Sequence, residues 1–314
     1  MLKYVIKRIF RSFMTLFIVT SVVFMLMRLM PEEGYFGDGY DKLDEVQREA
    51  IMTGMGLRDP MHIQLFHFYK GLIKGDLGTS ITYRPKVPVT EILAKKIPYS
   101  LWLGLSSIFI AIIFGLWMGI SMAQHKDRLI DGAGTFYIVF IRAVPSAVYY
   151  LFLQLYLTSW LKLPILFDVD DKASFFLPLL SMSLVSLAGY AMWMRRYMVD
   201  ELNKDYIRLA RAKGLKSKEI MFKHVMRNAF VPMAQYLPTS ILFAISGSLY
   251  IESLYSIPGI GSLLVESIQR QDNPLVQSLV LIYAAISIFG LLMGDVLMAF
   301  FDPRIKFEAQ GGGR

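Results

Sequence analysis

The chain has 314 residues, of which 55% are hydrophobic and only 18% are charged, with a formal net charge of +8. A soluble domain of this length carries about 25% charged residues, so a soluble enzyme or binding module is excluded. The chain has no cysteine, which excludes disulfides, thiolate catalysis and cysteine-based metal sites. These features predict an all-α polytopic membrane protein.

Six apolar segments are long enough to be membrane-spanning helices. The basic N-terminus and the first apolar run predict an uncleaved first span, because no small-residue cleavage site follows. The third span contains one charge, Arg142, and a proline, Pro145. In chain order, the predicted spans are 12–27, 101–123, 132–157, 177–194, 231–251 and 274–294.

The first long connection, 29–100, is large enough to form a small folded extracytoplasmic segment after the first span. Its stretch DKLDEVQREAIMTGMG (41–56) predicts a short helix with a glycine stop, and HIQLFHFYKGLIKG (62–75) predicts a second, amphipathic helix. The chain is thereby divided into the cytoplasmic end and first helix (1–28), this segment, a five-helix core (101–301) and a cytoplasmic tail (302–314).

Orientation follows from the placement of Lys and Arg, which favour cytoplasmic loops. With the N-terminus inside, the cytoplasmic pieces are 1–11, 124–131, 195–230 and 301–314, and the loop 195–230 alone carries ten basic residues. The opposite loops, 158–176 and 254–273, carry few. We therefore expect six spans with both ends in the cytoplasm.

The basic loop contains DYIRLARAKGLKSKE (205–219), which has the pattern of two short helices. Asp205 is a suitable N-cap, and Gly214 suits the positive φ that ends a helix. The helix between them has only about two turns, so it needs packing from another surface. Ser217 is a suitable cap for the second helix, which runs toward Pro232 and the fifth span. A plain topological anchor would need the charge but not this order of caps and glycine.

The same loop resembles the one found in permeases of ATP-binding-cassette importers, which begins Glu-Ala-Ala and has a glycine four residues after the second alanine. Ala210 and Gly214 match that alanine and glycine, while Arg208 and Leu209 replace the preceding Glu-Ala. Pro232 follows the glycine by 18 residues rather than about a dozen. Both departures are typical of the oligopeptide/dipeptide/nickel subfamily. Further stretches match that subfamily: RLMPEEG (28–34), GDLGTS (75–80), IESLYSIPGIGSLLVESI (251–268) and FDPRI (301–305).

The resemblance implies a type I importer permease, and the large segment after the first span is similar to that of the first-listed (B-type) permease of a pair. It implies that the 205–214 helix is a coupling helix on a cytoplasmic ATPase. The residues concerned are Asp205, Tyr206, Arg208, Leu209, Ala210, Arg211, Ala212, Lys213 and Gly214.

The partners implied by the resemblance are a second, C-type permease, two ATPases and an extracytoplasmic binding protein, in a bacterial or archaeal cell membrane. The chain lacks a GxxxxGK[ST] phosphate loop, so no catalytic residue, cofactor or metal is expected in it, and the partner ATPases would bind ATP and magnesium. Peptides are the expected substrate, with nickel chelates or oligosaccharides as alternatives within the same class.

Two residues are candidates for the translocation path or its gate. Arg142 lies inside a predicted span, where a charge is costly unless it is paired or hydrated. It faces a wet substrate path and meets a peptide carboxylate, or it pairs structurally with another carboxylate, or it snorkels along a helix kinked at Pro145. Glu252 ends the fifth span before Pro258-Gly259 and either lines an outer gate or caps that hairpin. A secondary transporter is the alternative of a different class, but ion-coupling carboxylates are not central in any predicted span.

Overall fold

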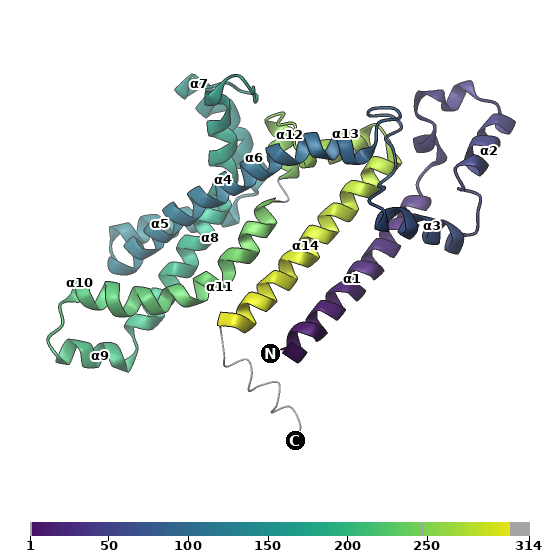
Figure 1. Ribbon diagram of the computed structural model, residues 1–314. Helices are drawn as coiled ribbons and strands as arrows, with labels where there is room; N and C mark the ends of the chain where they lie inside the picture. The colour runs from purple at the N-terminus through teal and green to yellow at the C-terminus, as the bar shows by residue number, and fades with distance from the viewer. Residues whose placement is uncertain (1, 246–247, 302–314) are drawn as a thin grey trace. The chain divides into compact units, whose positions relative to one another are not determined.

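The computed structural model describes residues 2–245 and 248–301, and in this part of the chain the regular elements are all helices (Figure 1). One isolated β-bridge joins Thr79 and Pro88. The all-α prediction is therefore confirmed. The chain divides into two compact units, residues 1–100 with 258–292, and residues 101–257 with 293–314.

The first unit contains the N-terminal helix, the 29–100 segment and two later helices. Both helices predicted in that segment are present. Asp44 caps the first with a capping box, in which its carboxylate accepts from Gln47 N at 2.7 Å and the Gln47 side chain accepts from Asp44 N. The elements are α1 (Leu2–Arg28), η1 (Glu32–Tyr35), η2 (Gly37–Lys42), α2 (Glu45–Gly54), α3 (Met61–Ile73), the start of α4 (Val89–Gln124), α13 (Ile260–Gln269) and most of α14 (Asn273–Phe301).

A buried carboxylate joins the GDLGTS region of this unit to the turn before α14. Asp272 is fully buried, and its Oδ2 accepts from Ser80 Oγ at 2.5 Å. The same oxygen accepts from the consecutive amides of Ile81, Thr82 and Tyr83, each at 3.0 Å. Three successive N–H groups aimed at one oxygen form an anion-binding nest. Here the chain fills the nest with its own aspartate.

The second unit holds the remaining helices, which pack around α8. Its buried cluster includes Ile108, Tyr190, Met194 and Met233, contributed by α4, α8 and α11. The elements, besides the rest of α4, are α5 (Leu129–Ala143), α6 (Ser146–Phe152), η3 (Leu153–Leu157), α7 (Thr158–Leu161), η4 (Lys172–Phe175), α8 (Phe176–Leu202), α9 (Asp205–Ala212), α10 (Ser217–Glu219), η5 (Ile220–Val225), α11 (Met226–Ile245) and α12 (Leu249–Leu254).

Two glycines bring α4 and α8 into backbone contact. A Cβ added at Gly115 would lie 2.8 Å from the Leu187 carbonyl oxygen, and one added at Gly119 would lie 2.6 Å from that of Ala191. The four-residue spacing places both glycines on one face of α4. This small-xxx-small seam is the arrangement by which helices in lipid approach closely.

Four helical segments are long and apolar enough to cross a membrane: Val5–Arg28, Val89–Gln124, Lys172–Leu202 and Asn273–Val296. They cover the first, second, fourth and sixth predicted spans. The third predicted span, 132–157, is not one continuous helix, because α5 and the helices after it meet at an angle of 108°. Pro145 stands at this break, where its ring disfavours α geometry for Val144. The bent pair counts as a fifth span if it crosses as one unit.

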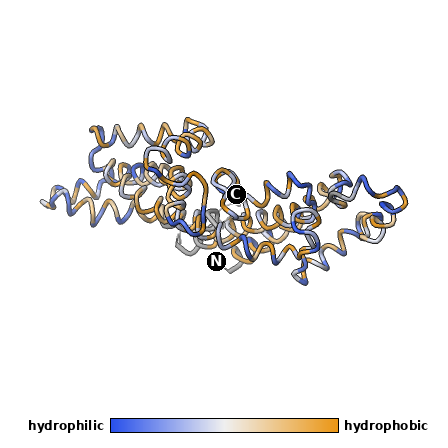
Figure 2. The backbone as a smooth tube through the Cα atoms, turned by 90° about the horizontal axis from the view of Figure 1, so that it is seen from above, coloured by the Kyte–Doolittle hydropathy of each residue, from blue (hydrophilic) through white to orange (hydrophobic). Residues whose placement is uncertain are grey.

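The fifth prediction, 231–251, overlaps α11 and the start of α12 but also covers residues 246–247, which lie outside the described residues. The predicted tail, 302–314, and most of the FDPRI motif lie outside them as well. Along the described helices, hydrophobic residues predominate in the long segments and hydrophilic ones gather toward their ends and connections (Figure 2). A multi-pass membrane fold of four or five candidate spans follows.

Candidate functional site

The second unit contains a cavity of about 610 Å³ with a mixed polar and apolar lining. Four helices contribute to it, α4, α5, α8 and α11. Among the described residues that line it, Arg142 alone is charged. The lining residues are Ser107, Ile108, Arg142, Met182, Val185, Ser186, Gly189, Tyr190, Trp193, Tyr197, Pro232, Met233 and Ser240.

One stripe of α8 forms the largest wall of this cavity. Its members follow helical spacing from Met182 through Ser186 and Gly189 to Trp193 and Tyr197. Gly189 adds no side chain to this wall, and a Cβ placed there would meet nothing within 4 Å. The middle of the stripe is therefore open space.

Arg142 reaches the cavity from the last turn of α5, directly before the break at Val144 and Pro145. One of its guanidinium nitrogens donates to Met192 Sδ at 2.8 Å, and a thioether is a weak acceptor. Among the described residues, no carboxylate lies within ion-pair distance of it. The structure thus brings Arg142 to a cavity and leaves its charge without an ion-pair partner among the described residues. Within this part of the chain, a structural ion pair therefore does not explain why an arginine lies here.

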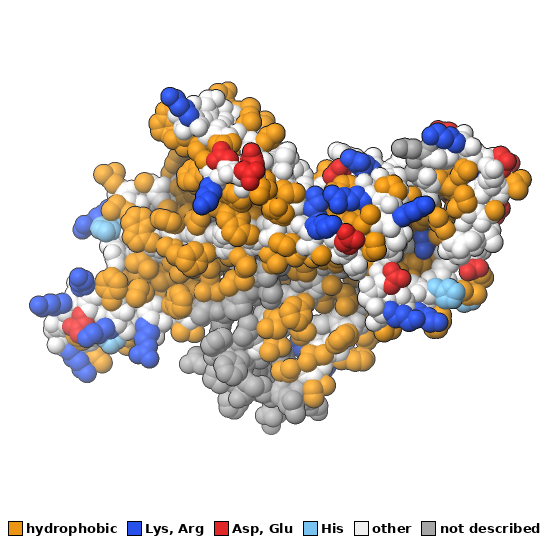
Figure 3. Space-filling view, turned by 45° about the horizontal axis from the view of Figure 1, so that its top comes forward, with side chains coloured by type: hydrophobic (Ala, Val, Ile, Leu, Met, Phe, Trp, Pro, Cys, Tyr) orange, Lys and Arg blue, Asp and Glu red, His pale blue; other side chains and the backbone are white. Residues whose placement is uncertain are grey.

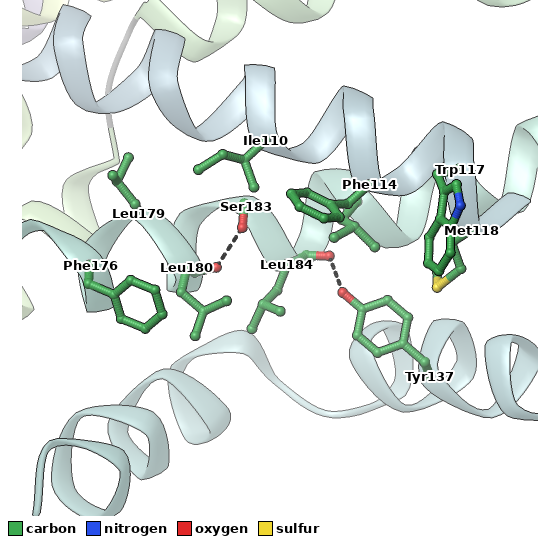
Figure 4. A pocket seen from close by; sticks show the side chains of 11 residues that line it. Ile110, Phe114, Trp117, Met118, Tyr137, Phe176, Leu179, Leu180, Ser183 and Leu184 are labelled. Carbon is green, nitrogen blue, oxygen red and sulfur yellow. Dashed lines mark hydrogen bonds between the residues drawn. The ribbon is translucent and has the colours of Figure 1, made fainter. Parts of the chain in front are cut away.

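A second hollow in this unit, about 530 Å³, lies on the other side of α8 and is almost wholly apolar (Figure 4). Its hydroxyl groups are already used within the protein: Ser183 donates to the Leu180 carbonyl at 2.8 Å and Tyr137 to the Leu184 carbonyl at 2.9 Å. A polar solute would find no partner there. The cavity with Arg142 is the better candidate for a solute path.

The predicted short helix of the basic loop is present as α9, and Gly214 follows it with φ of +79°. Leu215 N donates to the Ala210 carbonyl at 3.2 Å, which completes the glycine C-cap. The two predicted caps are wrong. Asp205 is the first helical residue, its carboxylate accepting from Arg208 instead of from the helix amides, and Ser217 likewise lies inside α10 without a capping bond.

The inward face of α9 packs in the core of the second unit, and its outward face is exposed. Ile207 is fully buried and Ala210 is 7% exposed, both within the unit's core, whereas Leu209 is 57% exposed. The Ala210 methyl group therefore packs inside the chain and does not face outward. Sequence reasoning missed Ile207, although its spacing of three from Ala210 is the usual signal. The short helix is held by its own protein on one side and faces outward with the other.

A polar link joins α9 to both neighbouring long helices. The Tyr206 hydroxyl donates to the Glu201 carboxylate near the end of α8, and Asn228 Nδ2 near the start of α11 donates to the Tyr206 oxygen at 2.8 Å. Burial and the Glu201 carboxylate raise the pKa of Tyr206 above its usual value, so its hydroxyl stays protonated. Both α8 and α11 also line the cavity with Arg142. A displacement of α9 would act on two of the four cavity walls.

The outward surface of this region is basic. Exposed residues of α9 and the following turn include Arg208, Arg211, Lys213, Lys216 and Lys218. Figure 3 shows the corresponding group of Lys and Arg side chains on the projecting knob at lower left, beside a broad hydrophobic face. Ala212 and Lys213 are exposed next to Gly214. These positions are free of intramolecular packing and available to a partner.

Glu252, the candidate gate residue, is fully buried in α12. Its backbone carbonyl accepts from Ile257 N at 2.8 Å, and Ser248 Oγ, not Glu252, caps the helix by accepting from Ile251 N. Whether the Glu252 side chain lines a gate or caps the Pro258-Gly259 hairpin stays a prediction. The structure does not bring Glu252 into the lining of the Arg142 cavity.

A buried ion pair on the same unit was not foreseen. Arg195 donates to both oxygens of Asp131, at 2.5 and 2.7 Å, and the Asp131 side chain is 5% exposed. The pair joins the first turn of α5 to α8 across 64 positions of sequence. Such a bidentate pair fixes orientation. It holds the beginning of α5, while Arg142 stands at the end of the same helix.

Comparison with known proteins covers nearly the whole chain. Residues 99–307 match the family described as "Binding-protein-dependent transport system inner membrane component", and residues 1–103 match the N-terminal family of such membrane components. The dipeptide transport system permease protein of Lactococcus lactis is 33% identical over 309 residues, and the oligopeptide transport system permease protein of Bacillus subtilis is 31% identical over 317. Each alignment covers 98% of this chain and 100% of the relative.

The glutathione transport system permease protein of Salmonella typhi is 32% identical with the same coverage. Among solved structures, an amino acid ABC transporter crystallised with histidines is similar with a TM-score of 0.50 and 16% identity, over 68% of this chain and 92% of that one. That likeness supports the fold. The chain therefore belongs to the family of binding-protein-dependent transport system inner membrane components, as a non-catalytic, multi-pass permease of the bacterial inner membrane.

Proposed function

We propose that this permease forms half of the translocation path of an ATP-driven peptide importer, and that α9 passes the movement of a cytoplasmic ATPase to the path. The observation that carries the proposal is the placement of α9. One face is anchored by Ile207 and Ala210, and the other presents Leu209 and Arg208 outward. A docking helix needs both faces, because it must receive a force and pass it on.

The path is the cavity lined by α4, α5, α8 and α11. Tyr206 ties α9 to the α8 and α11 ends through Glu201 and Asn228. When α9 moves, the cavity-lining residues on α8 and α11, among them Tyr197 and Met233, would move with it. In this proposal Glu252 has a gate-region role, as a buried carboxylate just before the Pro258-Gly259 hairpin.

The family implies ATPase and binding-protein partners. We propose the finer composition of a second, C-type permease, two ATPases and one extracytoplasmic binding protein. We also propose six spans with both termini in the cytoplasm, which would place α9 and its basic surface on the ATPase side. A secondary transporter, the alternative of a different class, is excluded by the family.

The proposed substrate class is short peptides. Three relatives of nearly equal similarity are named for dipeptide, oligopeptide and glutathione transport, and glutathione is itself a peptide. Nickel chelates or oligosaccharides remain the alternative cargo within the same importer class. A cavity that combines aromatic walls with one cation suits peptides better than uncharged sugars.

The test is Leu209→Asp in the complete transporter, assembled with its partner permease and both ATPases. Leu209 is 57% exposed and lies outside the buried cluster of the unit, so membrane content should be unchanged. Copurification of the ATPases and peptide-stimulated ATP hydrolysis should fall at least tenfold, since an apolar contact at the centre of an interface contributes about 2 kcal/mol.

The matched control is Leu166→Asp, at a leucine of similar exposure (48% against 57%) in the connection between α7 and η4. It should leave the ATPases bound. If Leu209→Asp retains full ATPase binding and stimulated hydrolysis, α9 is a topological anchor and the proposed coupling is wrong.

A further inference from the structure

We propose that Arg142 is a binding residue for the carboxylate group of the substrate, so that the cavity selects solutes bearing a free carboxylate, such as the C-terminus of a peptide. This inference rests on the proposed translocation path and adds to it the chemical group that the path recognises. It is carried by the uncompensated charge, its donor geometry and the open space beside it.

The charge is the first step. Arg142 lies in a segment that is long and apolar enough to cross a membrane together with the helices after the break. A charge within a membrane span is costly unless it is paired or hydrated, and the Arg142 side chain is exposed. Among the described residues the guanidinium has one acceptor, the Met192 sulfur. Retaining arginine here therefore requires water or an anionic ligand.

The donors are the second step. A guanidinium has five N–H groups in a planar fork that matches a carboxylate with two parallel hydrogen bonds. The single bond to Met192 leaves most of these donors unused within the described part of the protein. Exchange of the thioether for a carboxylate would be favourable, because a thioether is a weak acceptor, whereas a carboxylate is anionic and accepts two parallel bonds from the guanidinium.

The space is the third step. The cavity of about 610 Å³ exceeds the volume of a dipeptide or tripeptide end group, and Gly189 leaves its middle unobstructed. Trp193, Tyr197 and Tyr190 supply aromatic surface for side chains. The walls beyond Arg142 carry no fixed charge, so they place no further constraint on the sign of those side chains. A single carboxylate-binding site, in a cavity whose walls do not discriminate among side-chain charges, recognises the C-terminal carboxylate that all peptides share.

The experiment uses the absence of cysteine from the chain. Ser186→Cys places a single thiol on the cavity wall, in the complete transporter reconstituted in proteoliposomes. Its labelling rate is measured with an anionic reagent, sulfonatoethyl methanethiosulfonate, and with a cationic one, trimethylammonioethyl methanethiosulfonate. A unit charge lining the same wet cavity changes the local concentration of such reagents by about tenfold.

With Arg142 present, the anionic reagent should react faster than the cationic one. Arg142→Gln should lower the anionic rate about tenfold, and Arg142→Lys, which keeps the charge, should preserve it. Millimolar trialanine should slow anionic labelling severalfold, whereas trialaninamide, which lacks the carboxylate, should not. In Arg142→Gln, protection by trialanine should be lost. Membrane content of each variant is measured on the same samples.

The proposal is overturned if the thiol of the Ser186→Cys variant reacts with neither reagent, if Arg142→Gln leaves the ratio of rates unchanged, or if trialaninamide protects as well as trialanine. It is also overturned if trialanine gives no protection. Labelling needs no ATP hydrolysis, so these outcomes are independent of the Leu209→Asp result. Retained ATPase coupling in Leu209→Asp, together with carboxylate protection by trialanine, would refute the proposed function of α9 alone.

Discussion

Asp272 offers the sharpest test of how the 29–100 segment is held together. In Asp272→Ala, Ser80 Oγ and the amides of Ile81, Thr82 and Tyr83 lose their common acceptor at once. A hydrogen bond to a charged group contributes about 1.5–3 kcal/mol, and bonds to one atom are not additive.

Because the three amide residues are only partly buried, water replaces part of what is lost. We therefore expect a net local destabilisation of about 3–5 kcal/mol. Asp272→Asn keeps one acceptor oxygen but loses the charge, and it should cost about half as much. Every 1.4 kcal/mol is a factor of ten in the open population, so the alanine variant should open the 80–87 loop at least a hundredfold more often.

The assay is limited trypsin cleavage of the purified transporter, followed at the bond after Lys86. Cleavage of a transiently open loop tracks its open population when closing is fast. Asp76→Ala is the matched control, because it removes one exposed bond from the same segment, Asp76 Oδ1 to Gly78 N at 2.8 Å. Cleavage of Asp272→Ala within twofold of the native rate would refute the role given to the nest.

Three further outcomes are expected. Gly119→Leu should lower the stability of the α4–α8 seam by about 3 kcal/mol, measured as a lower melting temperature in detergent. Asp131→Asn should cost about 2–3 kcal/mol, discounted because Arg195 is 29% exposed, with the same readout. The hydrogen bond from Arg58 lowers the pKa of Glu49, so its stabilisation is present above about pH 4.3 and is lost as the pH falls through the lowered value. The difference in melting temperature between Glu49→Gln and the native protein should therefore vanish in acid.

Each of these has its own control. Gly132→Leu changes a helical glycine with no neighbour within 4 Å of an added Cβ and should be tolerated. The double variant Asp131→Leu with Arg195→Met should recover much of the loss, since it leaves no buried charge unpaired. A melting difference for Glu49→Gln that persists unchanged down to pH 3 would contradict the ion pair with Arg58.

Local signals in the sequence predicted the local structure well. The glycine stop at Gly214, the helix before it and the two helices of the extracytoplasmic segment follow from caps, glycine positions and apolar spacing. The assignment of Asp205 as a cap failed because the helix starts one residue earlier than a capping aspartate requires, and cap positions shift easily by one residue.

Long-range pairings could not be predicted. Asp272 and Ser80 are 192 residues apart, and nothing in either local pattern indicates the other. The break after Arg142 was visible as Pro145, but a proline in a span permits a kink as well as a full turn. Its angle of 108° depends on packing against α8. The cavity itself arises from four helices whose contacts no single segment encodes.

The glycine seam has a mechanical consequence for the cavity. Gly115 and Gly119 leave no room between the α4 and α8 backbones, and close-packed surfaces deform little. Those two helices therefore move as one rigid unit, and a change in the width of the cavity has to come from movement of the other two walls relative to it. One of these, α5, ends at the turn beside Arg142; the other, α11, continues directly from the π-helical segment η5. The passage would then widen and narrow as α5 and α11 move relative to the α4–α8 pair, which shifts as one unit when α9 is displaced.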